Sequence, residues 1–295
     1  MLASTPNAWE YKYMLAEETI VITGASSGFG EAFAEEMAKR AVAQNRAQST
    51  RILLIARSVD KLQTLANKLQ EQYDCCAEAL PCDLASKEQR TQLLTKLQAL
   101  SSDSMWLINN AGLGDYGEFI TAEPERNTQM LEVNITAPVE ITRCMLPAMA
   151  EAKKAYIINI ASLAADLAIP DFAMYAASKA FVASFSEALR LELKKTHIHV
   201  TAVCPGPVHT AFGDVARRSG SQKKEVPFRK WFYTSIPCVV TGAIKAVLSN
   251  KPRFYPSFKI RMAGLFVRCA PLWLLRAIMG RRPRKAIPTA EHEER

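Results

Sequence analysis

Three side chains in this sequence could move a proton together. Tyr175 and Lys179 lie in the stretch MYAASKAF, which begins at residue 174, and Ser162 precedes the tyrosine by thirteen residues. A helical separation of four residues puts Tyr175 and Lys179 on one face, with their Cβ atoms about 5–6 Å apart. A neighbouring ammonium group lowers the pKa of a phenol from its usual ~10, so the pair could serve as a general acid and base. The same spacing also fits a packed tyrosine beside a solvated lysine.

Two polar residues are candidates to complete this site. Ser162 ends the apolar run IINIAS, so its hydroxyl could donate to a substrate oxygen, although serines at such positions commonly cap turns. Asn134, within LEVNIT, falls in a predicted helix, where asparagine is not favoured by propensity. It can equally be an ordinary polar residue.

These candidate residues must be positioned by a sheet. Short β-branched or apolar runs alternate with amphipathic segments along most of the chain, and the runs lack the alternation of half-exposed strands. Parallel strands buried on both faces have this pattern. The sequence therefore predicts an α/β fold: a doubly wound, Rossmann-type, mostly parallel seven-stranded sheet with helices on both faces, plus a C-terminal helical extension. The expected strands are residues 19–23, 51–56, 77–80, 105–109, 155–161, 199–204 and 253–255.

A glycine-rich turn follows the first expected strand. TGASSGFG holds Gly24, Gly28 and Gly30 in the pattern G-x-x-x-G-x-G, directly before a predicted helix. Glycines in this context allow a tight turn and let the backbone approach a pyrophosphate, which binds the free N–H groups of the helix. The segment therefore predicts a dinucleotide site, against the alternative of a plain glycine-rich turn.

The second expected strand ends in LLIARS, where nicotinamide-binding sheets meet the adenosine ribose. An acidic residue there would accept from the ribose 2′-hydroxyl, whereas Arg57 offers a cationic fork that suits a 2′-phosphate. Arg57 therefore favours NADP(H) over NAD(H), unless it is only a surface arginine. Ser26 and Ser27 could add hydroxyl donors to that phosphate, and Asp83, after the third strand, could accept from an adenine amino group.

Together these motifs are typical of one family. TGASSGFG, CDL, NNAG, VNIT, the strand-end serine, YAASK and PGPVHT occur in that order, and the chain resembles the classical short-chain dehydrogenase/reductase family over about residues 17–211. The resemblance implies that Tyr175 protonates a carbonyl oxygen, that Lys179 also holds the nicotinamide ribose, and that the Asn134 backbone binds a water linked to Lys179. It further implies cofactor contacts from Phe29, Leu84, Asn109, Ala111, Gly112, Pro205, Gly206, Val208 and Thr210.

The resemblance implies hydride transfer between a nicotinamide and a carbonyl/alcohol pair without fixing the substrate. We expect an NADPH-dependent reductase of an apolar ketone or aldehyde of the steroid, retinoid or acyl type. The alternative is a non-catalytic, NADP(H)-sensing interaction protein that docks through a basic C-terminal face, and the intact Ser, Tyr and Lys set weighs against it. An aromatic cluster should cover the substrate or simply pack a lid: Phe212, Phe228, Trp231, Phe232 and Tyr233.

We expect one dinucleotide-binding catalytic domain at residues 17–257, with a substrate loop at about 211–235, between an N-terminal arm at 1–16 and an apolar and basic extension at 258–295. Residues 1–13 are either a loose arm or an extension upstream of an alternative start at Met14, and residues 41–50 should form a surface loop. Seven cysteines without a C-x-x-C pair predict mostly buried free thiols in a reducing, cytoplasmic setting, and with four histidines we expect no metal site.

The C-terminal third is strongly basic. Residues 217–285 hold 17 Lys or Arg and one acidic residue, whereas the whole chain carries a net charge of only +8. This asymmetry suggests an anionic partner, but no nucleic-acid-binding module is recognisable, so we expect none. Residues 259–285 alternate apolar stretches with arginine, and their apolar span is shorter than the ~20 residues of a membrane helix. They could lie in an anionic membrane interface, or pack on the domain or a second subunit; we expect a homodimer or homotetramer.

Overall fold

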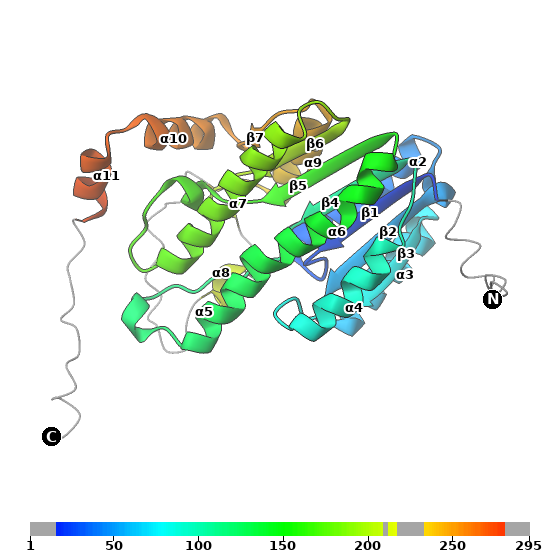
Figure 1. Cartoon of the computed structure of the whole chain (residues 1–295), viewed down its shortest axis with the longest axis horizontal. Helices are drawn as coiled ribbons and strands as arrows, with labels where there is room; N and C mark the ends of the chain where they lie inside the picture. The colour runs from blue at the N-terminus through cyan, green and yellow to red at the C-terminus, as the bar shows by residue number, and fades with distance from the viewer. Residues whose placement is uncertain (1–15, 209–211, 217–232, 281–295) are drawn as a thin grey trace, which may run out of the picture.

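The protein is built on one parallel sheet, as the computed structural model shows (Figure 1). The structure describes residues 16–208, 212–216 and 233–280. Every strand boundary lies within one residue of the expected range, which confirms the predicted seven-stranded sheet. The strands are β1 (Glu18–Thr23), β2 (Thr50–Ala56), β3 (Cys76–Pro81), β4 (Ser104–Asn109), β5 (Lys154–Ile160), β6 (Ile198–Val203) and β7 (Arg253–Phe254).

The strand order determines where a ligand can bind. The sheet runs β3-β2-β1-β4-β5-β6-β7, and every neighbouring pair is parallel. The chain moves outward from β1 to β3 and then crosses back to start the other half at β4. In such sheets a crevice opens beyond the carboxyl ends of the two strands where the direction reverses. The glycine turn follows β1 and the NNAG segment begins at the end of β4, so both motifs meet at this crevice.

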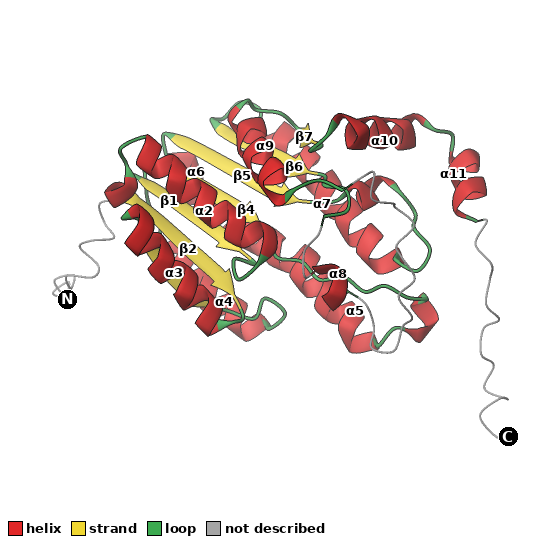
Figure 2. Ribbon diagram, turned by 180° about the vertical axis from the view of Figure 1, so that it is seen from behind, coloured by secondary structure: helices red, strands yellow, loops and turns green. Residues whose placement is uncertain are grey.

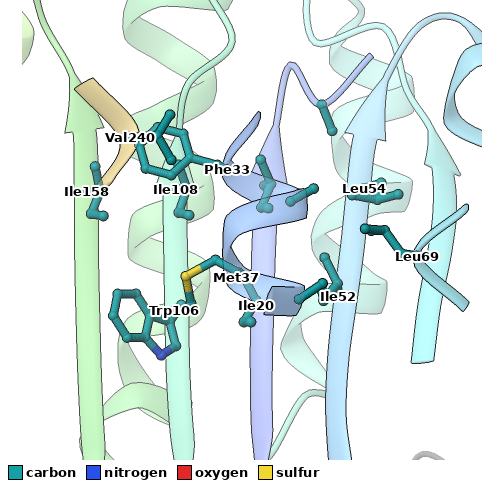
Figure 3. Close-up of a cluster of buried hydrophobic side chains, with 14 of the residues drawn as sticks. Ile20, Phe33, Met37, Ile52, Leu54, Leu69, Trp106, Ile108, Ile158 and Val240 are labelled. Carbon is teal, nitrogen blue, oxygen red and sulfur yellow. The ribbon is translucent and has the colours of Figure 1, made fainter. Parts of the chain in front are cut away.

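Helices cover both faces of the sheet (Figure 2). One layer comprises α2 (Gly28–Ala43), α3 (Val59–Tyr73) and α9 (Ile236–Leu248), and the other comprises α4 (Lys87–Gln98), α6 (Ala137–Glu151) and α7 (Ala173–Glu192). In the first layer, Phe33 and Met37 of α2 pack with Ile20 and Ile108 of the sheet and Val240 of α9 (Figure 3). All five side chains are essentially inaccessible to solvent, so this interface fixes where α2, and the turn before it, meets the sheet.

The remaining elements are short or lie at the ends of the domain. They are η1 (Ala47–Ser49), η2 (Phe119–Thr121), α5 (Pro124–Leu131), the π-helix η3 (Glu132–Thr136), η4 (Leu163–Asp166), α8 (Phe212–Val215), α10 (Phe258–Cys269) and α11 (Leu272–Met279). The loop expected at residues 41–50 is only partly confirmed. Helix α2 continues to Ala43, and a left-handed Asn45 with φ of 55° turns the chain toward η1 and β2.

The cysteines are less buried than the sequence suggested. Cys75, Cys82 and Cys204 are buried, whereas Cys238 and Cys269 are exposed, and all seven are free thiols. The exposed pair lies near the beginning of α9, on the side of that helix away from the core, and at the end of the largely exposed α10. Within the described residues, no group of three or more His, Cys, Asp or Glu side chains could hold a metal ion.

Helices α10 and α11 extend from one end of the domain (Figures 1 and 2). Only Ile260 and Gly264 of α10 are buried, and no residue of α11 is. The packing of both helices on their own domain is therefore limited to one short contact. In the part of the chain that the structure describes, no single helix is long and apolar enough to cross a membrane; α10 and α11 reach that length only as a pair bent by 116°.

Candidate active site

A cleft of about 790 Å³ lies at the carboxyl ends of the strands. The turns after β1 to β6 and the N-terminal half of α7 form its walls. Most of the residues that the sequence assigned to a cofactor line it, so segments distant in the chain converge as expected. They are Gly24, Ser26, Ser27, Gly28, Phe29, Arg57, Asp83, Leu84, Ala111, Gly112, Tyr175, Lys179, Pro205, Gly206 and Val208. Thr210, Phe228, Trp231 and Phe232 lie outside the described residues.

The glycine turn has the geometry of an anion cradle. Gly24 and Gly28 have φ of 67° and 60°, left-handed values that only glycine adopts without strain. Gly30 does not line the cleft but lets α2 approach the turn, because a Cβ there would lie 2.1 Å from the Gly24 carbonyl oxygen. No side chain caps the N-terminus of α2 at Ser27, which leaves the first N–H groups of the helix for a ligand. These features fit the pyrophosphate of a dinucleotide.

Asn110 connects the segment after β4 to the turn after β1. The sequence analysis did not assign a role to it. Its side-chain Nδ2 donates to the carbonyl oxygens of Thr23 (2.9 Å) and Gly24 (3.1 Å), while its backbone N–H donates to Thr23 Oγ1 (3.0 Å). Asn110 therefore locks the NNAG segment onto the glycine turn. A polar residue immediately after a buried strand at the crevice was the available signal for it.

Asn109, which the sequence assigned to the cofactor, has a different position. Its side chain is buried and donates to Asn159 Oδ1 (2.8 Å) and Thr142 Oγ1 (3.1 Å), between β4, β5 and α6. Asn109 is not among the described residues that line the cleft. Because successive strand residues point to opposite faces, Asn109 and Asn110 cannot both face the ligand. The side chain of Asn109 supports the sheet.

The far end of the cleft is suited to an adenosine phosphate. Arg57 and Ser58, after β2, line it together with Lys61 on the first turn of α3. Lys61 lies four residues from Arg57 and adds a second cation that the sequence analysis did not assign. On the opposite wall, Asp83 Oδ1 accepts from the backbone N–H of Ala85 (3.0 Å), which fixes the carboxylate after β3.

Tyr175 and Ser162 both line the cleft, and their hydroxyl groups lie close enough for Ser162 to lower the pKa of the phenol. Ser162 also caps η4, since its Oγ accepts from the Ala164 N–H at 3.1 Å, so the capping alternative and the position in the cleft hold together. Burial raises the pKa of Tyr175 to about 12, and Ser162 opposes this only in part. The expected lowering of this pKa by Lys179 is therefore not found.

Lys179 shows why. Its Nζ donates to the carbonyl oxygen of Ile160 at 2.8 Å and lies 5.8 Å from the centre of the Tyr175 ring, rather than at the phenol oxygen. Burial lowers the pKa of the Lys179 ammonium group to about 8. Gly112 gives it room, because a Cβ there would come within 3.3 Å of Nζ. Desolvation thus dominates the pKa of both groups.

Asn134 lies in the π-helix η3, and its side chain has a defined structural role. Oδ1 accepts from the N–H of Leu113 (2.7 Å), while Nδ2 donates to the Leu113 carbonyl (2.9 Å) and to Ser178 Oγ (2.9 Å). These bonds hold the segment after β4 against α7, one residue from Lys179. A π-turn inside a helix commonly marks a functional site. The irregular backbone of this π-helix accommodates an asparagine, which a regular α-helix does not favour.

An aromatic wall covers Tyr175. Phe172 stacks on its ring with centroids 4.2 Å apart, and Phe212 packs against it at 5.5 Å. Tyr116 meets Phe172 edge to face, and Leu167 and other apolar side chains line the same part of the cleft. This wall excludes water from the phenol, which accounts for its raised pKa. Of the aromatic cluster expected from the sequence, Phe212 and Tyr233 line the cleft.

Comparisons with known proteins agree with this geometry. Residues 18–219 match the family model described as short chain dehydrogenase, so the chain belongs to the short-chain dehydrogenase family. The fold of this family binds a nicotinamide cofactor. The chain is 32% identical over 204 residues to a mouse very-long-chain 3-oxoacyl-CoA reductase, with 68% of this chain and 62% of the relative covered. It is also 32% identical over 196 residues to an uncharacterized oxidoreductase of Staphylococcus saprophyticus, covering 66% of this chain and 80% of that protein.

Solved structures give the same fold. A short-chain dehydrogenase from Sphingobium yanoikuyae in complex with NADPH is similar with a TM-score of 0.72 at 25% identity, covering 93% of this chain and 100% of that one. One from Burkholderia phymatum in complex with NAD is similar with a TM-score of 0.70 at 22% identity, covering 93% and 99%. The two neighbours thus hold different nicotinamide cofactors, and the match to the mouse reductase spans 62% of its length.

The buried ammonium group of Lys179 predicts a pH-dependent stability. Below pH about 8 the lysine is charged in both states, so burial penalises the folded protein in full; between about 8 and its ordinary value of 10.5 the penalty disappears. Lys179→Met should therefore raise the melting temperature at pH 7, and the gain over the wild type should shrink as the pH rises to 10. Paired thermal melts across this range would measure it. A pH-independent difference would contradict the assigned burial penalty.

Proposed function

We propose that the protein is an NADPH-dependent reductase that converts an apolar ketone or aldehyde to the alcohol, with Tyr175 as the general acid. The observation that carries the proposal is that Ser162, Tyr175 and Lys179 line one cleft together with the glycine turn, whose geometry fits a dinucleotide. When bound, the nicotinamide supplies the hydride. The chain must then bind the carbonyl oxygen and deliver a proton to it.

Each polar residue of the site would have a separate role in the reaction. The Ser162 hydroxyl donates to the substrate oxygen, which stabilises the negative charge that develops there. Tyr175 gives its phenolic proton to the same oxygen, and its raised pKa keeps that proton in place at neutral pH. Lys179, with its pKa lowered to about 8, can return a proton toward the phenol and bind ribose hydroxyls. Asn134 positions the Leu113 segment beside them and, by its backbone, a connecting water.

The substrate end of the cleft favours an apolar molecule. Phe172, Phe212, Leu167 and Ile169 surround the space next to Tyr175. Among steroid, retinoid and acyl carbonyls, we favour an acyl type, since relatives about 30% identical are named very-long-chain 3-oxoacyl-CoA reductases. A flexible acyl chain can follow an aromatic wall without the fixed outline that a steroid requires.

The proposed preference for NADPH over NADH depends on two positively charged side chains. Arg57 and Lys61 line the adenosine end of the cleft from adjacent turns of the chain. A 2′-phosphate would receive charge-assisted hydrogen bonds there, whereas a 2′-hydroxyl would find no carboxylate at the end of β2. We therefore favour NADPH over NADH.

Replacement of Tyr175 tests the reaction. Tyr175→Phe should lower kcat/KM by about 10²- to 10⁴-fold, the usual contribution of a general acid, while NADPH binding is kept. Turnover is followed as NADPH consumption with a panel of acyl, steroid and retinoid ketones, and binding by NADPH fluorescence. Tyr73→Phe, at the end of α3, is the matched control and should leave both values unchanged. Undiminished turnover by Tyr175→Phe would remove this residue from its role.

Replacement of Arg57 tests the cofactor. Arg57→Asp should reduce the preference for NADPH over NADH by about 10- to 100-fold, since a hydrogen bond to a charged group contributes about 1.5–3 kcal/mol. The ratio of kcat/KM for the two cofactors measures this effect. Arg143→Asp changes an exposed arginine of α6 by the same charge and should leave the ratio as it is. If Arg57→Asp behaves in the same way, the assignment of NADP(H) loses its basis.

We also propose that the protein works in the cytoplasm as a homodimer or homotetramer and contacts an anionic membrane through residues 259–285. Support comes from the exposed apolar side chains of α10 and α11, which have little contact with the domain. Residues 258–280 contain four basic and no acidic residues, so charge and apolar surface occur together as in an interfacial helix. The exposed apolar side chains are Phe258, Met262, Leu265, Phe266, Leu272, Trp273 and Ile278.

Vesicle sedimentation tests this contact. The wild type should bind phosphatidylcholine vesicles that contain phosphatidylglycerol more strongly than pure phosphatidylcholine, and salt should weaken the binding. Trp273→Glu should reduce binding several-fold, whereas Val42→Glu, an exposed apolar residue on α2, should not. Equal binding to both vesicles would count against an electrostatic contact. A change of oligomeric size in Trp273→Glu would instead assign this face to a second copy of the chain.

A further inference from the structure

A buried acidic residue closes the short helix that begins at Ser162. Asp166 is the last residue of η4, and its side chain is only 9% exposed. Its Oδ1 accepts from Arg253 Nη1 at 3.1 Å, and its Oδ2 accepts from the Tyr255 hydroxyl at 3.2 Å. Both carboxylate oxygens are thus held by side chains almost ninety residues later in the chain. The ion pair matters, because an unpaired carboxylate this deeply buried would be strongly destabilising.

The segment from Ala161 to Asp166 is consequently fixed at both ends. At its beginning, the N–H of Ala161 donates to the Val203 carbonyl (2.8 Å) and that of Leu163 donates to the Pro205 carbonyl (2.9 Å). At its end, the contacts of Asp166 attach it to β7 and the residue that follows. Helix η4 is a single turn of four residues, so a shift of its last residue is transmitted directly to Ser162 at its N-cap.

The three residues of this contact do not face the substrate. None of Asp166, Arg253 and Tyr255 is among the described residues that line the cleft, whereas Leu163 and Ala164, within η4, do line it. Any influence of Asp166 on the reaction must therefore pass through the position of the η4 segment.

Tyr255 connects the same contact to α10. A Cβ added at Gly264 would lie 2.7 Å from Tyr255 Cε1, so the helix backbone packs closely against the tyrosine ring. The hydroxyl of that ring, which also lies close to Gly264, donates to Asp166 Oδ2. Tyr255 is therefore enclosed between α10 and η4, which restricts the rotamers open to it and gives Asp166 a rigid partner.

We propose that Asp166 is a positioning residue: through Arg253 and Tyr255 it holds η4 so that Ser162 Oγ stays beside the Tyr175 hydroxyl. This role rests on the proposed reductase function. It requires no new chemistry, because Asp166 neither donates nor accepts a proton in the reaction. Its effect is geometric, and displacement of a catalytic group by about 1 Å can reduce a rate by ~10²-fold.

A double-mutant cycle tests the role. Asp166→Asn keeps the shape of the side chain but removes the charge that pairs with Arg253. It should lower kcat by about 10- to 100-fold in the wild-type background and by less than about 2-fold in Ser162→Ala, where the positioned hydroxyl is already gone. The Kd for NADPH should not change. Equal losses in the two backgrounds, or no loss in the wild-type background, would overturn the proposal.

Two further variants sharpen the result. Tyr255→Phe removes the hydroxyl that donates to Asp166 Oδ2 and that also interacts with Arg253 and Cys204, but it keeps the ring against α10 and the ion pair of Asp166. Its effect should therefore be smaller and again absent in Ser162→Ala. Asp103→Asn is the matched control, because Asp103 forms an exposed ion pair with Lys153 (2.6 Å) and should leave kcat unchanged.

Hydrogen–deuterium exchange provides a readout that needs no substrate. Amides of residues 161–167 should exchange faster in Asp166→Asn, while those of β1 keep their wild-type rate. An unchanged rate in 161–167 would overturn the proposal even if no substrate turned over. Conversely, faster exchange together with an inactive wild type would retain the positioning of η4 and reject the proposed reductase function.

Discussion

The burial of Lys179 is the constraint on which the active site depends. An ammonium group excluded from water must be compensated by its surroundings, and here the Ile160 carbonyl at the end of β5 provides the principal contact. Gly112 leaves space for Nζ, and Asn134 holds the neighbouring segment through Ser178. The reacting groups are therefore positioned mainly by the ends of β4 and β5 and by α7.

The two ends of the cleft are built in different ways. At the cofactor end, backbone groups dominate: the left-handed glycines, the start of α2 and the Asn110 contacts define the space before any ligand enters. At the substrate end, the walls are side chains, chiefly Phe172 and Phe212 around Tyr175. A site made of backbone groups suits a cofactor that all members of a family share, whereas a wall of side chains can be changed by single substitutions. Membership of the family therefore says more about the cofactor than about the substrate.

Much of the fold and of the site could be predicted from the sequence, because buried parallel strands are readable as uninterrupted apolar runs. The glycine turn, Ser162, Tyr175 and Lys179 were found from short motifs in their strand and helix context. The motif gives two adjacent asparagines, and only the structure shows that the side chain of Asn109 bonds Asn159 while Asn110 lines the cleft. The raised pKa of Tyr175 was missed because part of the burial of its ring comes from Phe212, which belongs to a separate segment of the chain. Asp166 was missed for the same reason, as its partners are distant in sequence.

The position of Tyr255 changes how the end of the chain should be regarded. Helices α10 and α11 resemble an appendage in outline, since almost all of their surface is free of the domain (Figure 1). Yet Gly264 forms one side of the enclosure around Tyr255, whose hydroxyl supports Asp166. Trimming the chain before α10 would therefore remove one side of the enclosure around Tyr255, next to the η4 wall of the cleft. A contact that supports this wall thus comes from a helix whose side chains are mostly exposed.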